Sequence, residues 1–512
     1  MYDNLGKDAI SKIESNPYCL LDITYGVDFK QVDKMAMDLG LAYNNSKRIE
    51  SSIKYGLVIS SYNGHSCVIK ENLIRYIVDL IDVGSSDIED NIINLNAKKE
   101  IIIETKDGEE WVYLYPFYKA EQNIAEKIHK LNKTKNIKKL KNLSAILRKQ
   151  EEEFGIKLSE KQIEAIEVVN DNNVSIITGG PGTGKTTIIR NIIEMYKSQD
   201  MKVVLCAPTG RAAKRITETT GEEAKTIHRL LEIGKIQEES ILETVDLEVS
   251  PVDGDIVIID EMSMVDVFLM NNILKGIFLG TKVVLVGDEN QLASVGPGSI
   301  LKDIIASGVV KTISLNEIFR QAARSKIIVN SHNVNQGITF TRKDEIDIEV
   351  EEKEEDFFYI NEHNQNKILE QVISLCTGRL KKYGEYDFFK NIQILTPTKK
   401  GMLGTKELNK SLQSVLNPQK DEREEKTYGD QVYRIGDRIM QIKNNYDIYW
   451  ERGKEPGSGV FNGELGYIQD IDRESKQIQV LFDDNKTCWY LYTELDQLEH
   501  AYSITIHKSQ RK

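Results

Sequence analysis

The sequence lacks paired cysteines, a long apolar run and an apolar N-terminal segment. Its five cysteines are scattered through 512 residues and none forms a Cys-x-x-Cys pair, which argues against a disulfide framework and a zinc site. It holds no run of 18 apolar residues, so no transmembrane helix is expected. The first residues carry no apolar signal-peptide core. We therefore expect a cytoplasmic protein with reduced thiols.

The sequence also lacks an excess of positive charge. Lys and Arg number 67 against 80 Asp and Glu, which gives a net charge of −13. This balance excludes a protein that holds nucleic acid through bulk positive charge, but it leaves room for a local basic channel. At roughly 150 residues per domain, the length predicts about three or four modules.

Four short apolar runs carry the pattern of buried strands. Each is rich in β-branched residues and ends at a glycine-rich or acidic turn, and helical patterns lie between the runs. Strands that are apolar on both faces are typical of a parallel sheet covered by helices. We therefore predict an α/β fold with strands at VSIIT (174–178), KVVLCAP (202–208), DIVIID (255–260) and KVVLVGD (282–288).

The regions on either side of this core differ from it. Residues 28–40 have apolar residues at helical spacing and end on a glycine. Residues 101–117 hold two β-rich runs around Asp107-Gly108, which is a hairpin signal. Residues 431–499 are β-rich with Gly and Asn-Gly punctuation, which predicts a small barrel.

A basic stretch covers residues 127–149, KIHKLNKTKNIKKLKNLSAILRK. Two interpretations are open for it. It could contact the phosphate backbone of a nucleic acid, or it could be a solvated connecting helix. We favour the connecting helix.

Residues 179–186, GGPGTGKT, match the phosphate-binding pattern G-x-x-x-x-G-K-[ST]. The buried-strand pattern before the motif and the helical pattern after it are the context that such a loop needs. Glycines let successive backbone amides turn toward phosphate oxygens, and the following helix adds its positive end. We expect Lys185 to reach the β- and γ-phosphates and Thr186 to ligate Mg²⁺. The whole predicted set is Gly179, Gly180, Pro181, Gly182, Thr183, Gly184, Lys185, Thr186 and Thr187.

Asp260 and Glu261 end the strand pattern DIVIID. A carboxylate at the carboxyl end of such a strand points into the crevice where nucleotides bind. We expect Asp260 to hold Mg²⁺ and Glu261 to polarise the attacking water as a general base. An acidic pair after a strand is a weak signal alone and a strong one after a phosphate-binding loop.

Two further side chains are candidates for contact with the γ-phosphate. Gln291 follows the next strand, and its amide can both donate and accept, so it could touch the γ-phosphate and the attacking water. Arg320 is a candidate arginine finger. The alternatives are a polar turn residue at Gln291 and a surface ion pair at Arg320.

Taken together, these motifs resemble one family, the RecD-like (RecD/TraA type) group of superfamily 1 DNA helicases. The resemblance runs from about residue 16 to residue 510, nearly the whole chain. The N-terminal segments NPYCLLDI and GVDFKQVDKMAMDLG resemble the free-standing bacterial members. The segments that carry the resemblance include LSEKQIEAI (158–166), TGGPGTGKTT (178–187), APTGRAAKR (207–215), DEMSMVD (260–266), GDENQLASVGPGSIL (287–301), EIFRQ (317–321), VFNGELG (460–466) and AYSITIHKSQ (501–510).

The resemblance implies two RecA-like P-loop motor domains with a helical N-terminal region and an inserted SH3-like β-barrel. The expected domains are a helix-hairpin-helix and winged-helix-like region (1–125), a basic connecting helix (126–150), motor domain 1 (151–330) with a duplex-splitting pin hairpin (232–254), motor domain 2 (331–430 with 500–512) and the barrel (431–499).

The resemblance also implies roles for single residues. Gln162 would read the adenine edge through both atoms of its amide. Lys185, Thr186, Asp260, Glu261, Gln291 and Arg320 would take the catalytic roles described above, with ATP and Mg²⁺ as cofactors. The residues expected to contact DNA are Pro208, Thr209, Gly210, Arg211, Thr226, His228, Thr396, Thr505, His507 and Lys508.

The sequence departs from the family pattern at its ends. In the family, His-Lys-Ser-Gln is followed by glycine and then by a strand and helix with a second arginine that reaches the γ-phosphate, whereas here Arg511 and Lys512 follow. The leading domain of long members is also missing. We therefore expect a chain shortened at both ends that binds ATP and Mg²⁺ but hydrolyses ATP and unwinds DNA poorly.

The expected function is an ATP hydrolase that couples hydrolysis to 5′ to 3′ movement on single-stranded DNA and unwinds duplex. One alternative is a nucleotide-gated module that binds single-stranded DNA without unwinding it. Another is a structural subunit of a nuclease–helicase complex. We expect a monomer that binds single-stranded DNA and junctions with duplex, does not bind membranes, and works with other repair or recombination proteins.

Overall fold

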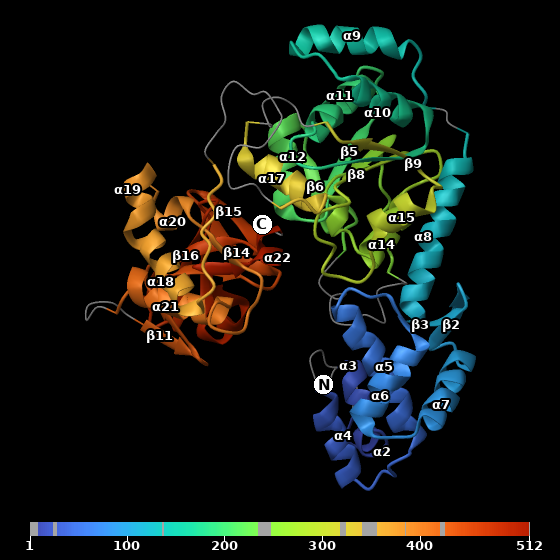
Figure 1. The fold of residues 1–512 in the computed structure, drawn as a ribbon, viewed down its shortest axis with the longest axis vertical. Helices are drawn as coiled ribbons and strands as arrows, with labels where there is room; N and C mark the ends of the chain where they lie inside the picture. Colours follow the sequence, from blue (N-terminus) through green and yellow to red (C-terminus); the bar gives the residue numbers. More distant parts are fainter. Residues whose placement is uncertain are drawn as a thin grey trace. The chain divides into compact units, whose positions relative to one another are not determined.

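The computed structural model of the chain forms two compact units, Met1–Phe357 and Phe358–Lys512, which are described separately (Figure 1). The structure describes residues 9–23, 28–135, 138–233, 247–317, 324–339, 356–384, 386–419 and 425–510. Within these ranges, no helix is both long and apolar enough to cross a membrane.

The first unit begins with a helical N-terminal region. Its helices are α2 (Ala9–Ser15), α3 (Cys19–Ile23), α4 (Phe29–Asp38), α5 (Ser46–Tyr62), α6 (Lys70–Ile81) and α7 (Ser85–Ala97). A small antiparallel sheet with the order β1-β3-β2 joins strands β1 (Cys67–Ile69), β2 (Ile101–Lys106) and β3 (Glu109–Leu114). The hairpin between β2 and β3 is confirmed, because Lys106 pairs with Glu109 across the two-residue turn. Both turn residues, Asp107 and Gly108, have the positive φ angles that such a tight turn requires.

The basic stretch 127–149 does not form one connecting helix. It forms the end of α8 (Tyr115–Lys133) and the beginning of α9 (Leu143–Phe154). The amide of Asn173 donates to the backbone carbonyls of Leu131 (3.0 Å) and Thr134 (2.5 Å). Side-chain donors at the last carbonyls of a helix satisfy groups that a longer helix would bond internally, so α8 ends there.

A six-stranded parallel sheet forms the core of the first unit. Its order is β6-β5-β7-β8-β4-β9, and each of the four predicted strands lies in it. Residues of β4, β7 and β8 are buried along their whole length, as the apolar runs predicted. The strands are β4 (Val174–Gly179), β5 (Val203–Ala207), β6 (Ala224–Thr226), β7 (Ile256–Ile259), β8 (Lys282–Gly287) and β9 (Lys311–Leu315).

Helices cover both faces of this sheet. One face packs against α9, α10 (Glu160–Asp171), α11 (Lys185–Lys197) and α12 (Gly210–Thr220). The other face packs against α8, α13 (Ile227–Leu230), α14 (Val267–Gly276) and α15 (Ile300–Ser307). Alternate residues of each strand enter the two cores, which is the arrangement of a doubly wound α/β fold.

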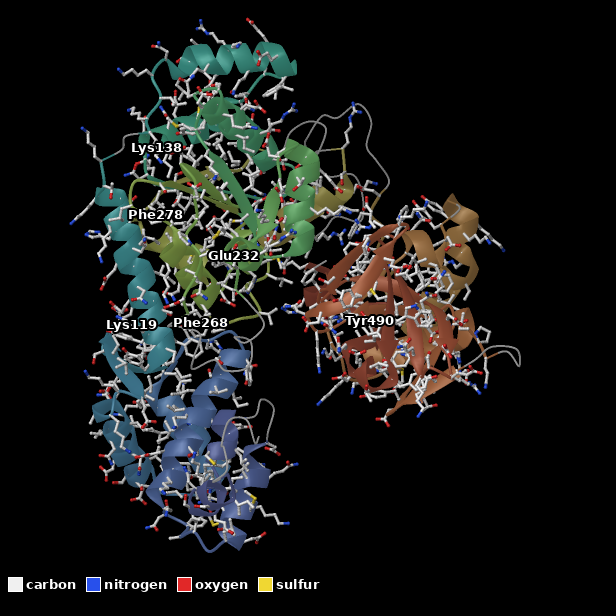
Figure 2. All side chains as sticks on the ribbon, turned by 180° about the vertical axis from the view of Figure 1, so that it is seen from behind. Lys119, Lys138, Glu232, Phe268, Phe278 and Tyr490 are labelled. Atoms are coloured by element: carbon white, nitrogen blue, oxygen red, sulfur yellow. The ribbon has the colours of Figure 1, made fainter. Side chains whose placement is uncertain are left out.

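The apolar core on the α14 side continues into the N-terminal region. Phe117 of α8 and Phe268 of α14 have ring centroids 4.9 Å apart, and Figure 2 labels Phe268 near Lys119 of α8. The N-terminal region and the motor sheet are therefore parts of one packed body rather than separate modules.

The second unit combines a small parallel pairing with an antiparallel sheet. Strands β10 (Ile394–Thr396) and β20 (Ser503–Thr505) pair in parallel. The helical segments are α18 (Gln365–Ser374), a π-helical turn (Leu375–Arg379), α19 (Leu380–Gly384), α20 (Phe388–Asn391), α21 (Thr405–Leu416) and α22 (Ile506–Gln510).

The β-rich region expected to form a barrel is a seven-stranded antiparallel sheet with the order β15-β14-β18-β17-β16-β13-β19. These strands are β13 (Arg438–Gln441), β14 (Asn445–Arg452), β15 (Glu455–Val460), β16 (Leu465–Asp472), β17 (Gln477–Phe482), β18 (Thr487–Leu491) and β19 (Leu498–His500). A separate hairpin joins β11 (Glu425–Tyr428) and β12 (Gln431–Arg434).

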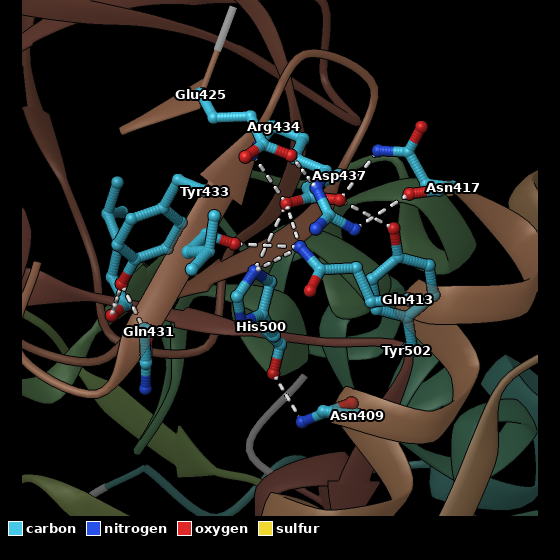
Figure 3. A network of polar contacts seen from close by, with 12 residues as sticks. Asn409, Gln413, Asn417, Glu425, Gln431, Tyr433, Arg434, Asp437, His500 and Tyr502 are labelled. Carbon is cyan, nitrogen blue, oxygen red and sulfur yellow. Dashed lines mark hydrogen bonds and ion pairs between the residues drawn. The ribbon is translucent and has the colours of Figure 1, made fainter. Parts of the chain in front are cut away.

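A buried polar network joins this antiparallel sheet to α21 (Figure 3). At its centre is the fully buried carboxylate of Asp437. It accepts hydrogen bonds from the amides of Gln413 (2.6 Å) and Asn417 (2.7 Å) and from the hydroxyl of Tyr502 (2.8 Å). His500 Nε2 lies 3.1 Å from the same carboxylate. The sheet is therefore fixed to α21 by several hydrogen bonds to one charged group.

The division after Phe357 differs from the boundary expected after residue 330. Helix α17 (Lys326–Asn335) stays with the first unit because His332 contacts the phosphate-binding loop. Arg320 lies outside the described residues, and so does residue range 234–246, which is most of the expected pin hairpin.

Candidate nucleotide and DNA sites

The GGPGTGKT segment forms the loop between β4 and α11. Gly182 and Gly184 have φ angles of +75° and +80°, which L side chains rarely adopt. A Cβ atom on Gly179 would lie 2.8 Å from the carbonyl oxygen of Leu315, so the loop passes close to β9. The hydroxyl of Thr183 donates to the carbonyl of Gly180 (2.8 Å), and this bond closes the turn. The loop shape therefore depends on glycine where the motif has it.

Lys185 lies in the first turn of α11, below the loop. Its ammonium donates to the carbonyls of Gly179 and Gly180, the latter at 3.0 Å. Burial lowers the pKa of Lys185, while the nearby carboxylates of Asp288 and Asp260 act in the opposite direction. The structure thus places the predicted phosphate-binding lysine among carboxylates at the carboxyl end of the sheet.

Asp260 and Glu261 follow β7 at the same edge of the sheet. Burial, with a smaller effect of Glu261, raises the pKa of Asp260 to about 6. The carboxylate of Asp260 accepts a hydrogen bond from the backbone amide of Glu261 at 2.8 Å. Glu261 has a φ angle of +53°, which is strained for a residue with a side chain and is common at functional sites. Its carboxylate lies 4.0 Å from the guanidinium of Arg215 on α12.

Gln291 follows β8, the strand next to β7. Its backbone amide donates to the carbonyl of Asp288 (3.2 Å), and its side-chain oxygen accepts from the hydroxyl of Ser263 (3.4 Å). Ser263 lies two residues after Glu261, so it links the two strand ends. The structure therefore places Lys185, Asp260, Glu261 and Gln291 at one edge of the sheet, and their catalytic roles stay predictions. Ser263 and Arg215 lie in the segments DEMSMVD and APTGRAAKR, but no role was predicted for either side chain.

Gln162 forms a different contact from the one expected. It occupies the third position of a capping box at the beginning of α10, where its side-chain oxygen accepts from the backbone amide of Ser159 (2.9 Å). Reading adenine through both amide atoms would require this oxygen to accept a second hydrogen bond or to exchange its partner. The role of Gln162 in adenine binding stays a prediction.

A histidine contacts the phosphate-binding loop from outside the predicted motifs. His332 Nε2 lies 3.2 Å from the carbonyl oxygen of Pro181, and a Cβ atom on Gly180 would lie 2.6 Å from the ring. Gly180 and His332 also line a pocket of about 160 Å³ with Asn290 and Asn316. A lone histidine on a helix carries no functional signal in sequence, so this contact could only be found in three dimensions.

Two of the predicted DNA contacts in the first unit begin helices at the carboxyl ends of β5 and β6. The hydroxyl of Thr209 accepts from the backbone amide of Ala212 (3.3 Å) and caps α12. The hydroxyl of Thr226 accepts from the amide of Arg229 (3.2 Å) and caps α13. Arg211, in the first turn of α12, is exposed. Helix N-termini of this kind favour phosphate groups.

The predicted DNA contacts of the second unit lie at the β10–β20 pair. Thr396 and Thr505 are register partners. The hydroxyl of Thr505 accepts from the amide of Lys508 (3.3 Å), and the Lys508 ammonium donates to the side chain of Asn462 (2.9 Å). Asn462 lies between β15 and β16, so it connects the antiparallel sheet to this strand pair. Asn462 lies in the segment VFNGELG (460–466), but no role was predicted for its side chain.

Comparison with known proteins agrees with this arrangement. Residues 1–67 match the HHH domain of the ATP-dependent RecD2 DNA helicase family, and residues 408–482 match the SH3 domain of ATP-dependent RecD-like DNA helicases. Residues 157–347, which contain the phosphate-binding loop and Asp260, match an AAA domain. Two domains of this chain, its HHH domain and its SH3 domain, are thus those of RecD-like DNA helicases.

Relatives of this RecD-like chain are similar over most of its length. It is 28% identical to the ATP-dependent RecD2 DNA helicase of Deinococcus radiodurans over 99% of this chain, and it spans 66% of the length of that relative. It is 29% identical to the RecBCD enzyme subunit RecD of Buchnera aphidicola over 78% of this chain and 73% of that subunit. The crystal structure of the Pif1 helicase from Candida albicans covers 70% of this chain and 86% of its own at 19% identity, with a TM-score of 0.35, which is too low to bear on the fold.

Proposed function

We propose that this RecD-like chain is an ATP-dependent translocase on single-stranded DNA that moves 5′ to 3′ and acts as a DNA helicase. The observation that carries the proposal is the position of Lys185, Asp260, Glu261 and Gln291, which lie at the carboxyl ends of adjacent parallel strands. Crevices at this edge of an open α/β sheet are where nucleotides bind.

The residues at this edge of the sheet have the chemistry to bind a nucleotide with Mg²⁺ on its phosphates. The hydroxyl of Thr186 and the carboxylate of Asp260 are oxygen ligands, which Mg²⁺ prefers. We infer that they hold Mg²⁺, which when bound neutralises charge on the β- and γ-phosphates. Lys185 already donates to oxygen atoms of the loop, and it would exchange these carbonyls for phosphate oxygens. The positive φ angles of Gly182 and Gly184 let backbone amides face the phosphates.

Hydrolysis would depend on the two residues that face the γ-phosphate side of this edge. Glu261 would accept the proton of the attacking water, and its left-handed backbone fixes the direction of its side chain. Gln291 would orient the same water, and the hydroxyl of Ser263 holds its amide. Arg320 would supply positive charge to the transition state, as the family resemblance implies.

Movement along DNA would follow from phosphate contacts in both units. Thr209 and Thr226 fix the beginnings of α12 and α13, whose amides and the nearby Arg211 would bind the backbone of a single strand. In the second unit, Thr505 and Lys508 would do the same. Such contacts are tolerant of sequence, which suits a translocase. We place this activity in the cytoplasm, on junctions of single-stranded and duplex DNA, in a monomer that works with repair or recombination proteins.

ATP hydrolysis stimulated by single-stranded DNA tests the proposal. We expect Lys185→Ala to lower kcat by about 10³ or more, because the lysine neutralises the transferred phosphoryl group. Lys197→Ala is the matched control, because exposed Lys197 lies on the same helix and pairs with half-buried Glu222, and its loss should leave kcat unchanged. Strand separation is measured with a 5′-tailed and a 3′-tailed duplex. Equal activity of the Lys185 variant and wild type, or unwinding of the 3′-tailed duplex alone, would contradict the proposal.

A further inference from the structure

The segment that leaves Gln291 leads toward the N-terminal region. We call residues 292–299 the sensor loop, because it connects the predicted γ-phosphate contact to α15. Within the loop, the hydroxyl of Ser294 donates to the carbonyls of Gly296 (2.9 Å) and Gly298 (3.0 Å). These bonds hold the loop in a compact turn.

One side of the sensor loop packs on the segment that follows Asp260 and Glu261. The backbone amide of Val267 donates to the carbonyl of Pro297 at 3.0 Å. A Cβ atom on Gly296 would lie 2.0 Å from the carboxylate of Asp266, so no other residue fits at that position without movement. Asp266 itself caps α14. The sensor loop is therefore in direct contact with the chain that carries both predicted catalytic carboxylates.

The other side of the sensor loop contacts the N-terminal region. The backbone amide of Gly298 donates to the carbonyl of Gly64 at 3.0 Å. Gly64 lies in the turn after α5 and has a φ angle of +91°. Beside it, Ser66 hydrogen-bonds the mostly buried carboxyl of Glu121 on α8. At the far end of α15, the amide of Asn132 on α8 donates to the carbonyl of Val309 (3.3 Å). The turn after α5 thus contacts the sensor loop, and α8 contacts the far end of α15.

The contacts between the sensor loop and the N-terminal region lie beside a packed apolar core. Phe117 of α8 lies against Phe268 of α14, and Asp266, which touches the sensor loop, is the residue that caps α14. Buried apolar residues continue without a break from the N-terminal helices to α14 and α15. Separating the N-terminal region from the sensor loop would expose this core, which makes the contact a permanent part of the first unit.

We propose that the N-terminal region positions Gln291 through the contact between Gly64 and Gly298, and so sets the rate of ATP hydrolysis. This inference rests on the proposed function, because it takes Gln291 as the residue that orients the attacking water. Gly64 and Gly298 are positioning residues: neither touches the nucleotide, and each acts through the sensor loop. Small displacements of a group that orients a reactant have large effects on rate, whereas ground-state binding of the nucleotide depends mainly on the phosphate-binding loop.

A pair of glycine variants tests this role through kinetics. Gly64 and Gly40 both have positive φ angles, +91° and +86°, in the N-terminal region, and a Cβ atom on either would meet nothing within 4 Å. Both substitutions by alanine therefore strain the backbone without a clash, but only Gly64 contacts the sensor loop. We expect Gly64→Ala to lower DNA-stimulated kcat by about three- to tenfold with KM for ATP unchanged, and Gly40→Ala to change neither. Equal kinetics for the two variants, or a rise in KM alone, would overturn the proposal.

Hydrogen exchange gives a second test that needs no turnover and no variant of the N-terminal region. In the wild-type chain, a non-hydrolysable ATP analogue with Mg²⁺ should slow exchange in peptides from residues 179–186 and also in peptides from 60–66. In Gln291→Ala, the first effect should remain and the second should be lost. Protection of 179–186 with no change at 60–66 in the wild type would overturn this inference and leave the proposed function standing. No protection at 179–186 would overturn both.

Discussion

The two units hold their predicted sites in place by different physical means. In the first unit, Asp260 and Gln291 follow strands β7 and β8, which are buried along their whole length and covered by helices on both faces. In the described part of the second unit, β10 and β20 are three residues each and the apolar cores are smaller. There the antiparallel sheet is also joined to α21 by hydrogen bonds to one buried carboxylate, Asp437.

This difference teaches where each unit is sensitive to change. Apolar packing is spread over many contacts, so a polar site residue at a strand end can be replaced with little effect on folding. A buried carboxylate with several donors is the opposite case, because removal of one group leaves all of its partners without a bond. We therefore expect that a substitution at the predicted site of the first unit changes the rate of hydrolysis without changing the free energy of unfolding. In the second unit, we expect a substitution in the polar network to lower the free energy of unfolding.

The strongest test of that separation is Glu261→Gln. Because Glu261 is the predicted general base, we expect kcat to fall by about 10²–10⁴ while nucleotide affinity and the urea midpoint of the first unit stay unchanged. Glu289→Gln is the control, since Glu289 follows the adjacent strand and has no predicted contact with the water. Stopped-flow ATP hydrolysis and binding of a fluorescent ADP give the two quantities. A loss of affinity as large as the loss of rate would contradict the assignment of Glu261.

The second unit should respond in the other way to Asp437→Asn. The neutral amide cannot accept all the hydrogen bonds that Gln413, Asn417 and Tyr502 now donate, and it brings donors of its own. We expect a loss of about 3 kcal/mol in the unfolding free energy of this unit. Native-state hydrogen exchange resolves the unit from the rest of the chain. Asp496→Asn, at the exposed salt bridge with Lys443 in the same unit, is the control and should cost less than about 1 kcal/mol. Similar costs for the two variants would remove the contrast between the units.

Lys282 is a polar exception inside the apolar first unit. Its ammonium, 1% exposed, donates to the carbonyls of Val169, Asn170 and Asn172 at the end of α10. Burial lowers the pKa of Lys282 to about 7, so the charge is costly in the folded chain. Loss of the three bonds and relief of this cost oppose each other, and we expect Lys282→Met to destabilise the unit by about 2 kcal/mol at pH 7. Lys139→Met, at an exposed ion pair, should change stability by less than about 0.5 kcal/mol.

The pH dependence of the same variant gives a sharper outcome. Between pH 7 and 10.5, the unfolded chain keeps the proton of Lys282 while the folded chain loses it. The unfolded state then binds more protons, so the unfolding free energy of the wild type rises with pH in this window. Lys282→Met should lose this rise, which urea unfolding at pH 7 and pH 9 would measure. A parallel pH dependence in the variant would mean that Lys282 keeps its charge.

The sequence predicted what depends on local pattern. The four strands, the glycine-rich loop and the Asp107-Gly108 hairpin were all found where periodicity and turn chemistry placed them. The single connecting helix was wrong, because its end depends on Asn173, which is distant in sequence from the last carbonyls of α8. Local propensity carries no information about such a partner.

Long-range polar contacts could not be predicted for the same reason. Asp437 and His500 are separated by 63 residues, and Gly64 and Gly298 meet through backbone atoms that any residue has. Gln162 illustrates a related limit, because the motif predicts an adenine contact while the capping box at Ser159 uses the same amide oxygen.

The smallest expected effect lies at the link between the antiparallel sheet and the β10–β20 pair. Asn462→Ala removes one acceptor of the Lys508 ammonium, which loosens a predicted DNA-binding side chain without exposing an apolar core. We expect the affinity for single-stranded DNA to fall by about fivefold, or about 1 kcal/mol, with stability unchanged. Asn366→Ala, on α18 of the same unit, is the control. If Asn462→Ala instead lowered the free energy of unfolding, the prediction would be wrong. The bond between Lys508 and Asn462 would then stabilise the fold of the second unit, as the Asp437 network does.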